Sequence, residues 1–446
     1  MMKFYTKFFT TVVLLLTLSF STAVLAQQWE QIQELPAAQN IFVAKNGNLI
    51  SSDFHFDYIG GIYYSQDGGL NWTKADVEDY AYNRMIQAGD YIIAAGEGCN
   101  LARSADNGIT WEVLNYGYMY SEYLTEEAIQ YNVCYAIIYY KNKLFLADFG
   151  GGGVIYSEDF GETWTMTDRE SLKYYIDGVA MTRAKDDGMA IDCFYNMAEN
   201  NNELLLFGVY FVYRLNETDY TWELLRNDSN FMGVSTTVNN RLFCGRAIMN
   251  YNANTPFLEY TEDGGRTWGR VGHADTLSYD TNVRAMHSDE KGMYVALQQG
   301  GFYYTTDMGE TWMNISDGIP YNINNNDGSK MYYSPLIVDS DDEYIYTAIY
   351  DLPWAGTSVS GIYRYKKSDL PVASVDRTLN DIAVYISNST IYTAEVADIA
   401  IYSINGTLVS NTTSAIEADL SSLARGVYIY QVTCNNATVT GKFIKR

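Results

Sequence analysis

The chain has 446 residues, of which 47% are hydrophobic and 15% aromatic, including 41 tyrosines, so it can form a large core and is not intrinsically disordered. This length is typical of two or three domains or of one large repeat fold. The formal net charge of −25, without a Lys/Arg cluster, excludes nucleic acid as a partner.

The first 26 residues have the parts of a secretory signal peptide. Two lysines precede a short apolar run, and Val24 and Ala26 occupy the positions of small residues before a cleavage site. The apolar run is shorter than the ~20 residues of a membrane anchor. We therefore expect a signal peptide over residues 1–26, cleavage between Ala26 and Gln27, and a secreted or cell-surface protein.

Five cysteines are scattered along the chain, and none belongs to a CxxC pair. In an exported protein they could form one or two disulfides, whose pairing the sequence does not assign. Their scattered spacing favours buried thiols. They are Cys99, Cys134, Cys193, Cys244 and Cys434.

One eight-residue motif recurs before residue 370. It begins with Ser or Thr and has Asp at its third position, Gly at its fifth and Trp at its eighth. A worn copy occupies residues 216–222. The good copies span 65–72, 104–111, 157–164, 261–268 and 305–312, and their aspartates are Asp67, Asp106, Asp159, Asp263 and Asp307.

This motif resembles the Asp-box (BNR) repeat of sialidases, sortilin-type receptors and many bacterial propellers. The resemblance implies a β-propeller in which each box staples the turn between two strands. The aspartate is expected to accept backbone hydrogen bonds, the glycine to adopt a positive φ, and the tryptophan to bury its ring between neighbouring sheets. We expect the box residues to be structural.

Short runs rich in aromatic and β-branched residues surround each box and indicate four strands per repeat, with a period of ~40–50 residues that fits one propeller blade. The third strand of the repeat recurs seven times, but no box follows its last copy. Residues 28–32 resemble the strand after a box. We therefore predict an all-β fold over residues 27–370, a seven-bladed β-propeller closed by the N-terminal strand.

A second module is expected over residues 371–446, where the composition shifts toward Ser, Thr, Ala and Val. Residues 399–409, 418–430 and 441–446 resemble the type A C-terminal sorting domain of the Bacteroidetes type IX secretion system. The resemblance implies outer-membrane secretion machinery as a partner. We expect a small immunoglobulin-like β-sandwich, and the alternative is such a sandwich without a sorting role.

Ligands are expected on the propeller face opposite the Asp-box turns, where the loops between blades and between second and third strands gather. Tyrosines and acids are frequent in these loops, and aromatic rings stack on sugar faces while acids hold hydroxyl groups. The candidate ligand-binding residues are Tyr118, Tyr120, Tyr123, Arg183, Arg246, Trp354, Asp53, His55 and Asp148.

Three functional classes fit these features. Recognition of a glycan or polysaccharide comes first, a glycoside hydrolase acting on a neutral polysaccharide second, and a non-enzymatic scaffold for protein ligands third. The sequence assigns no catalytic residue. A sialidase is disfavoured, because no Arg-Ile-Pro segment occurs, seven blades are expected instead of six, and the negative charge opposes an anionic sugar. No HExxH motif, phosphate loop or nucleophile elbow occurs, and the acidic run 339–343, which could bind Ca²⁺, is interpreted as a solvated hairpin turn, so neither a metal nor a cofactor is expected.

Overall fold

The computed structural model divides into two compact units, Met1–Pro371 and Val372–Arg446. The predicted signal peptide and Cys193 lie outside the described residues. The structure describes residues 28–33, 40–55, 58–122, 124–130, 132–148, 153–172, 174–176, 179–181, 194–208, 211–227, 232–246, 258–271, 282–324, 328–349, 359–371, 384–387, 390–434 and 437–445.

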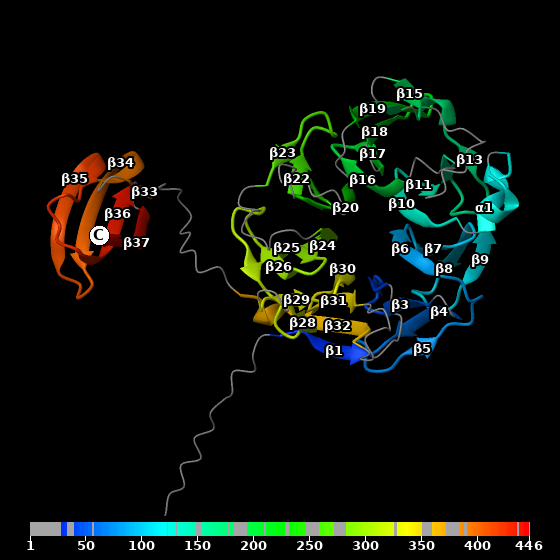
Figure 1. The fold of residues 1–446 in the computed structure, drawn as a ribbon, viewed down its shortest axis with the longest axis horizontal. Helices are drawn as coiled ribbons and strands as arrows, with labels where there is room; N and C mark the ends of the chain where they lie inside the picture. The colour runs from blue at the N-terminus through cyan, green and yellow to red at the C-terminus, as the bar shows by residue number, and fades with distance from the viewer. Residues whose placement is uncertain are drawn as a thin grey trace, which may run out of the picture. The chain divides into compact units, whose positions relative to one another are not determined.

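Four-stranded antiparallel sheets follow one another through the first unit and form a ring like the blades of a propeller (Figure 1). The first three consist of β2 (Phe42–Val43), β3 (Leu49–His55), β4 (Tyr58–Ser65) and β5 (Thr73–Lys74); β6 (Tyr82–Ala88), β7 (Tyr91–Gly96), β8 (Asn100–Ser104) and β9 (Glu112–Asn115); and β10 (Cys134–Tyr140), β11 (Lys143–Asp148), β12 (Val154–Ser157) and β13 (Thr165–Met166). The next three consist of β16 (Phe194–Asn200), β17 (Glu203–Gly208), β18 (Phe211–Asn216) and β19 (Thr221–Asn227); β20 (Met232–Val238), β21 (Arg241–Arg246), β22 (Leu258–Thr261) and β23 (Gly269–Arg270); and β24 (Val283–Asp289), β25 (Gly292–Leu297), β26 (Gly301–Thr305) and β27 (Met313–Asn314).

The last sheet joins the two ends of this unit. It consists of β30 (Pro335–Ser340), β31 (Tyr344–Ile349), β32 (Gly361–Lys366) and β1 (Glu30–Gln33). The N-terminal β1 pairs antiparallel with β32, with Glu30 opposite Arg364. The pairing predicted for the N-terminal strand is thus observed, and it leaves β32 without an open edge.

Neighbouring sheets cover each other's faces, and this explains the apolar second strands. In β7, β17, β25 and β31 every residue after the first is buried. A strand covered on both faces needs a continuous apolar run instead of an alternating pattern. The first strands of adjacent sheets contact one another around the axis of the ring, so that the ring is packed from its centre outward (Figure 1).

Trp29 anchors the closing strand. Its indole is 2% exposed, and its Nε1–H donates to the carbonyl of Ile315 at 2.7 Å. Its ring centroid lies 4.5 Å from that of Phe302 and 5.6 Å from that of Tyr365, which belong to two different sheets. The side chain therefore fills the space between the last two sheets of the ring.

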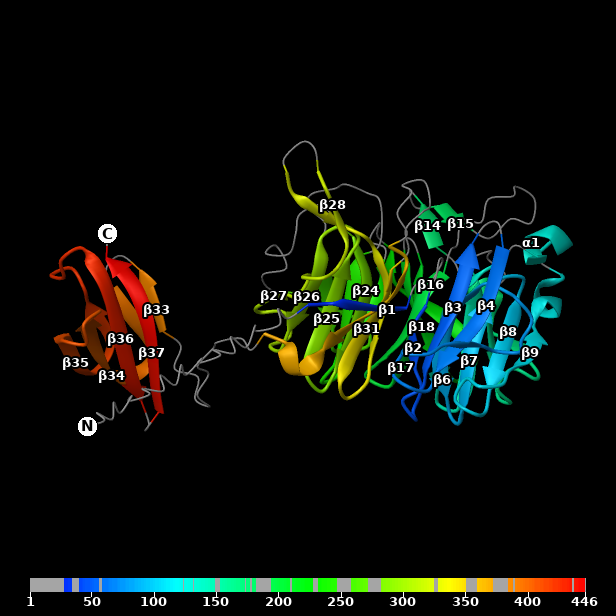
Figure 2. The same cartoon turned by 90° about the horizontal axis from the view of Figure 1, so that it is seen from below.

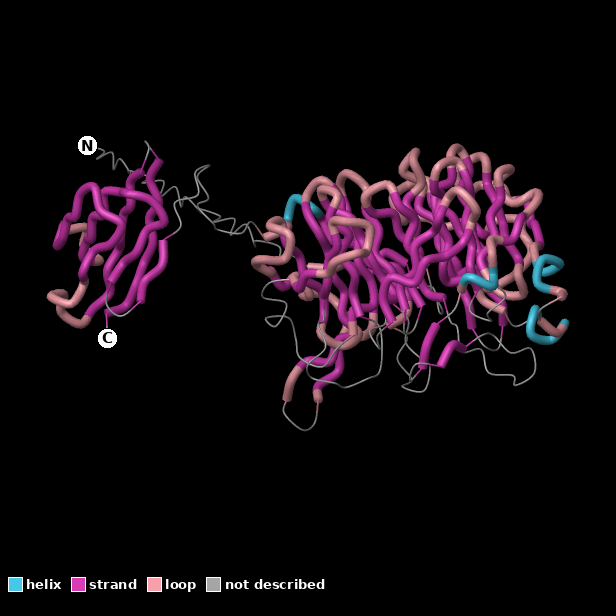
Figure 3. Tube along the Cα trace, turned by 90° about the horizontal axis from the view of Figure 1, so that it is seen from above, coloured by secondary structure: helices cyan, strands magenta, loops and turns pink. Residues whose placement is uncertain are grey.

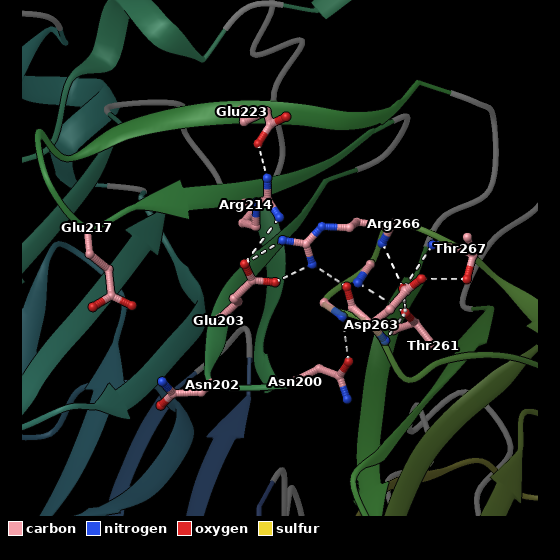
Figure 4. Close-up of polar contacts among 12 residues, drawn as sticks. Asn200, Asn202, Glu203, Arg214, Glu217, Glu223, Thr261, Asp263, Arg266 and Thr267 are labelled. Atoms are coloured by element: carbon pink, nitrogen blue, oxygen red, sulfur yellow. Dashed lines mark hydrogen bonds and ion pairs between the residues drawn. The ribbon is translucent and has the colours of Figure 1, made fainter.

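The Asp-box turns have a common hydrogen-bond pattern. In the second copy, Ser104 Oγ donates to Asp106 Oδ1 at 2.8 Å and accepts from the N–H of Gly108 at 2.8 Å. Asp106 accepts from the N–H and Oγ1–H of Thr110 at 2.8 and 2.6 Å, and Trp111 Nε1–H donates to Gly108 O at 2.9 Å. The copy around Asp263 repeats these contacts, and hydrogen bonds, foremost that from Thr267 Oγ1, lower the pKa of Asp263 to about 2 (Figure 4).

Replacing Asp106 with alanine is expected to lower the free energy of unfolding by about 1–2 kcal/mol, because turn donors lose their acceptor. Burial disfavours the Asp106 anion, but hydrogen bonds from Thr110 and Ser104 outweigh it and lower the pKa. The anion's stabilising contribution is therefore present above the ordinary Asp pKa and is lost as the pH falls through the lowered value. Thermal unfolding at pH 7 and at acidic pH measures this. Asp90→Ala, an exposed turn variant, is the control and should change little.

In the described part of the first unit, four short helical segments and two hairpins interrupt the regular pattern of the ring. Among the described residues, a 3₁₀ turn η1 (Gly117–Tyr120) and helix α1 (Glu126–Gln130) follow β9, and η5 (Lys367–Asp369) follows β32. A further turn, η2 (Arg169–Ser171), precedes the hairpin β14 (Tyr174–Ile176) and β15 (Val179–Met181). The hairpin β28 (Tyr321–Ile323) and β29 (Lys330–Tyr332) lies between β27 and β30.

The second unit is one five-stranded antiparallel sheet around a small core. The long strand β34 pairs with β35 along one edge and with β33 and then β36 along the other. Strands dominate this unit as they do the first (Figure 3). Its strands are β33 (Val384–Ser387), β34 (Thr390–Ser403), β35 (Leu408–Asp419), β36 (Gly426–Cys434) and β37 (Ala437–Lys445).

Cys99, Cys134, Cys244 and Cys434 are all buried side chains. Desolvation raises the pKa of the Cys244 thiol, so that it stays protonated and unreactive. In the part of the chain that the structure describes, no helix is long and apolar enough to cross a membrane.

Candidate functional site

The two ends of the ring differ in what they carry. The turns between first and second strands and between third and fourth strands lie at one end, which we call the Asp-box end. The turns between second and third strands and the connections between sheets lie at the other, which we call the loop end. Hairpins β14–β15 and β28–β29 project from the loop end (Figure 2). A regular scaffold with projecting loops at one end is the usual arrangement of a binding surface.

Several residues predicted from the sequence fall at the loop end. Asp53 and His55 end β3, Asp148 ends β11, and Arg246 ends β21. Asp148 pairs with Cys134, and Arg246 with Met232, so both sit beside the start of a first strand. The predicted candidates Tyr123, Arg183 and Trp354 lie outside the described residues.

Tyr118 and Tyr120 have opposite surroundings, although both were predicted to contact ligand. Tyr118 is 57% exposed, whereas Tyr120 is 0% exposed and packs edge-on against Tyr116 at 6.1 Å. The prediction for Tyr120 is therefore wrong. The segment folds as the 3₁₀ turn η1, which directs Tyr118 to solvent and Tyr120 into the core between two sheets.

The β28–β29 hairpin adds an exposed surface that the sequence reasoning missed. Tyr321 is 43% exposed and Ile323 is 52% exposed. The ammonium group of Lys330 lies 4.3 Å from the centroid of the Tyr321 ring, and Tyr332 packs against the same ring at 5.8 Å. Exposed aromatic side chains thus occur on two separate excursions of the loop end, η1 and β28.

The first strands share an irregularity near the loop end. In β6, β10, β16, β20, β24 and β30 the pairing with the second strand skips the second residue, which is a β-bulge. Bulges redirect a side chain and are frequent next to binding sites. The skipped residues, which we call the axial ring, are Asn83, Tyr135, Tyr195, Gly233, Arg284 and Leu336.

Two tyrosines of the axial ring are stacked, and the guanidinium of Arg84, which is not a member of the ring, lies over one of them. Tyr135 and Tyr195 are parallel to within 15°, with centroids 5.8 Å apart. Arg84, the residue after Asn83, lies 5.7 Å from the Tyr135 centroid and donates through Nε to the Tyr135 carbonyl at 3.2 Å. Desolvation lowers the pKa of Arg84, and the charge of Arg284 lowers it further. Arg84 and Arg284 therefore lie within electrostatic reach of each other.

Glu97 is an acid close to the same end. It lies between β7 and β8, and its N–H donates to the carbonyl of Ala81, just before β6, at 3.0 Å. Burial raises the pKa of the Glu97 carboxyl. A partly buried acid with a raised pKa can donate a proton, which is the property that the hydrolase alternative requires.

A hollow of ≈ 640 Å³ lies at the Asp-box end of the sheet β16–β19, beside the worn motif. Glu203, at its wall, accepts from Arg266 at 2.6 Å and from Arg214 at 3.2 Å, and Arg214 also pairs with Glu223 (Figure 4). The hydrogen bond from Arg266 lowers the pKa of Glu203. These charges neutralise one another, so the network ties two sheets together and leaves little charge for a ligand.

Two family models match separate parts of the chain. Residues 63–74 match the BNR/Asp-box repeat, and residues 380–446 match the secretion system C-terminal sorting domain. The chain carries an Asp-box repeat and a C-terminal sorting domain. The sorting domain indicates export and sorting to the cell surface. Both resemblances seen in the sequence are thereby confirmed. No curated protein matches the chain.

Solved structures with a similar fold include YCF48 from Cyanidioschyzon merolae, at 12% identity and a TM-score of 0.50, with 77% of this chain and 100% of that one covered. A structure of YCF48 bound to D1 peptide has 14% identity and a TM-score of 0.51, covering 78% and 96%. The extracellular domain of a hybrid two-component system from B. thetaiotaomicron has 10% identity and a TM-score of 0.51, covering 93% and 57%. At these identities the likeness shows the fold alone.

Proposed function

We propose that this protein is a secreted or surface-attached seven-bladed β-propeller that recognises a carbohydrate at its loop end. Residues 1–26 act as its signal peptide and residues 27–370 form the propeller. Residues 371–446 form an immunoglobulin-like unit that delivers it to the type IX secretion machinery. The confirmed sorting domain and the pairing of β1 with β32 support this organisation.

The observation that carries the proposal is the placement of exposed aromatic rings at the loop end. Tyr118 and Tyr321 are the exposed large aromatic side chains of the described residues, and both stand on excursions from that end. Rings of this kind stack on the apolar faces of pyranoses, while nearby amides and acids hold hydroxyl groups. A protein ligand is the second candidate, because a structural neighbour is a peptide complex.

The test is a glycan array followed by calorimetry on the mature chain, residues 27–446. Tyr118→Ala and Tyr321→Ala should each weaken binding of the captured glycan by about threefold to tenfold, since one stacking contact is lost. Neither change should move the melting temperature much, because both rings are exposed.

Leu70→Ala is the matched control. Leu70 is 69% exposed but belongs to an Asp-box turn at the opposite end of the ring, so its removal should not affect binding. If Leu70→Ala weakens binding and both tyrosine variants leave it unchanged, the ligand binds at the Asp-box end and the proposed loop-end site is wrong. Release of reducing sugar from the bound glycan would point to the hydrolase alternative.

A further inference from the structure

Two arginines approach each other across the axis of the ring. Arg84 lies in β6 and Arg284 in β24, and these strands belong to sheets that are not neighbours (Figure 1). Nevertheless, in addition to desolvation, the positive charge of Arg284 lowers the pKa of Arg84, and the Arg84 guanidinium lies 5.7 Å from the centroid of the Tyr135 ring. Charges on first strands of separated sheets can influence each other in this way only across the axis of the ring, around which the first strands lie. Both arginines remain partly exposed.

Neither arginine has an acidic partner. Among the described residues, Arg84 and Arg284 form no ion pair, and the guanidinium of Arg284 has no hydrogen-bond acceptor. This is unusual in a chain with 54 acids and 29 bases. Other arginines pair with acids, namely Arg103 with Glu112, Arg214 with Glu203, Arg226 with Glu259, Arg241 with Glu262, Arg266 with Glu203 and Arg364 with Glu30.

Two guanidinium groups without acidic partners raise the free energy of the folded state unless an anion binds between them. Two partly desolvated positive charges repel each other. Each guanidinium also has five N–H donors that need hydrogen-bond acceptors. Backbone carbonyls satisfy part of Arg84, through Nε to Tyr135 and through Nη1 to Asn83 at 3.1 Å. The Arg284 guanidinium is left to donate to the two oxygens of a carboxylate, which it matches in shape and charge.

The neighbouring side chains could contact the ring and the hydroxyl groups of a sugar that carries the carboxylate. Tyr135 and Tyr195 present stacked rings, Arg84 lies over the Tyr135 ring, and Asn83 adds an amide to the axial ring. Farther along β16, Asn196 donates to Ser235 Oγ at 2.7 Å, so the polar lining continues from sheet to sheet. The chain's net charge of −25 repels a long polyanion, whereas one carboxylate can be held locally by two arginines.

We infer that Arg84 and Arg284 bind the carboxylate of a single uronic-acid residue in the glycan recognised at the loop end. The inference rests on the proposed function and narrows it, because the sequence left the identity of the recognised glycan open and indicated a neutral polysaccharide only for the hydrolase alternative. Arg284 supplies the paired oxygen contacts, Arg84 supplies the second charge, and the axial tyrosines contact the ring of the sugar.

The test uses oligosaccharides that end in glucuronate, galacturonate or mannuronate, each paired with its neutral methyl ester. The mature chain should bind at least one acid at least tenfold more tightly than its ester. Arg284→Gln should abolish that preference and leave affinity for the ester within about twofold. Arg425→Gln, an exposed change in the second unit, is the control and should keep the preference.

Circular dichroism and the melting temperature establish that Arg284→Gln is folded, and because Arg284 has no hydrogen-bond partner among the described residues, this variant is a cleaner test than Arg84→Gln. Equal binding of acid and ester, or a preference that survives Arg284→Gln, would overturn the carboxylate site and leave glycan recognition standing. Binding of no saccharide at all, or only of a peptide with a free C-terminal carboxylate, would overturn both.

Discussion

Replacing Trp29 with alanine should lower the free energy of unfolding of the first unit by about 3–5 kcal/mol, the usual cost of removing a large aromatic side chain from a core. The indole is 2% exposed and contacts rings of two sheets. Its loss also leaves the carbonyl of Ile315 without its donor. Urea or thermal unfolding of the mature chain measures the effect.

Glu30→Ala is the control for this closure. Glu30 is the next residue of the same segment, and its ion pair with Arg364 is at the surface, so the change should cost no more than about 1 kcal/mol. Deleting residues 27–34 should exceed the Trp29 effect, because the β1–β32 hydrogen bonds are also lost. If the deletion leaves the melting temperature unchanged, β1 does not hold the ring together.

The repeated sheets could be predicted because the Asp box acts locally. The hydrogen bonds of the box join residues of a single turn, namely Ser104, Asp106, Gly108 and Thr110. Eight consecutive residues therefore determine the conformation of the turn. Because the box lies between the third and fourth strands of a sheet, each copy of the motif predicts the position of these two strands in the sequence. Closure by β1 could also be predicted, because a third strand without a following partner implies that another segment supplies one.

The residues of the axial ring could not be found in this way. Whether Arg284 is paired or skipped depends on the register between β24 and β25, and no local pattern marks a bulge in the sequence. Arg84 and Arg284 are two hundred residues apart and meet only because the ring closes. The net charge of −25 is a sum over the whole chain and does not predict that, among the described residues, Arg84 and Arg284 have no acidic partner.

The sequence also does not predict which tyrosines of a loop are exposed. Tyr118 and Tyr120 are separated by one residue in a Tyr-rich segment, and composition gives both the same expectation. The 3₁₀ turn decides between them by burying Tyr120 against Tyr116 and exposing Tyr118. A turn of this type has a spacing near three residues, so side chains two apart point in different directions.

Replacing Gly108 with alanine should lower the free energy of unfolding by about 2–5 kcal/mol, from two separate causes. Gly108 has φ +89°, a conformation that costs a residue with a Cβ about 1–2 kcal/mol. A Cβ there would also overlap Cδ1 and Cγ1 of Ile50, a buried residue of the preceding sheet, and overpacking of this kind costs about 1–3 kcal/mol. The Asp-box glycine is thus required by the contact between sheets as well as by the turn.

Gly47→Ala separates the two causes. Gly47 has φ +86°, but a Cβ built on it meets nothing within 4 Å, so this variant carries the conformational cost alone. Chemical denaturation should therefore show Gly108→Ala to be less stable than Gly47→Ala by about 1–3 kcal/mol. Combining Gly108→Ala with Ile50→Ala should cost less than the sum of the two single changes, because the smaller side chain removes the overlap. Equal losses for the two glycine variants, together with strict additivity in the double variant, would show that the box glycine serves only its own turn.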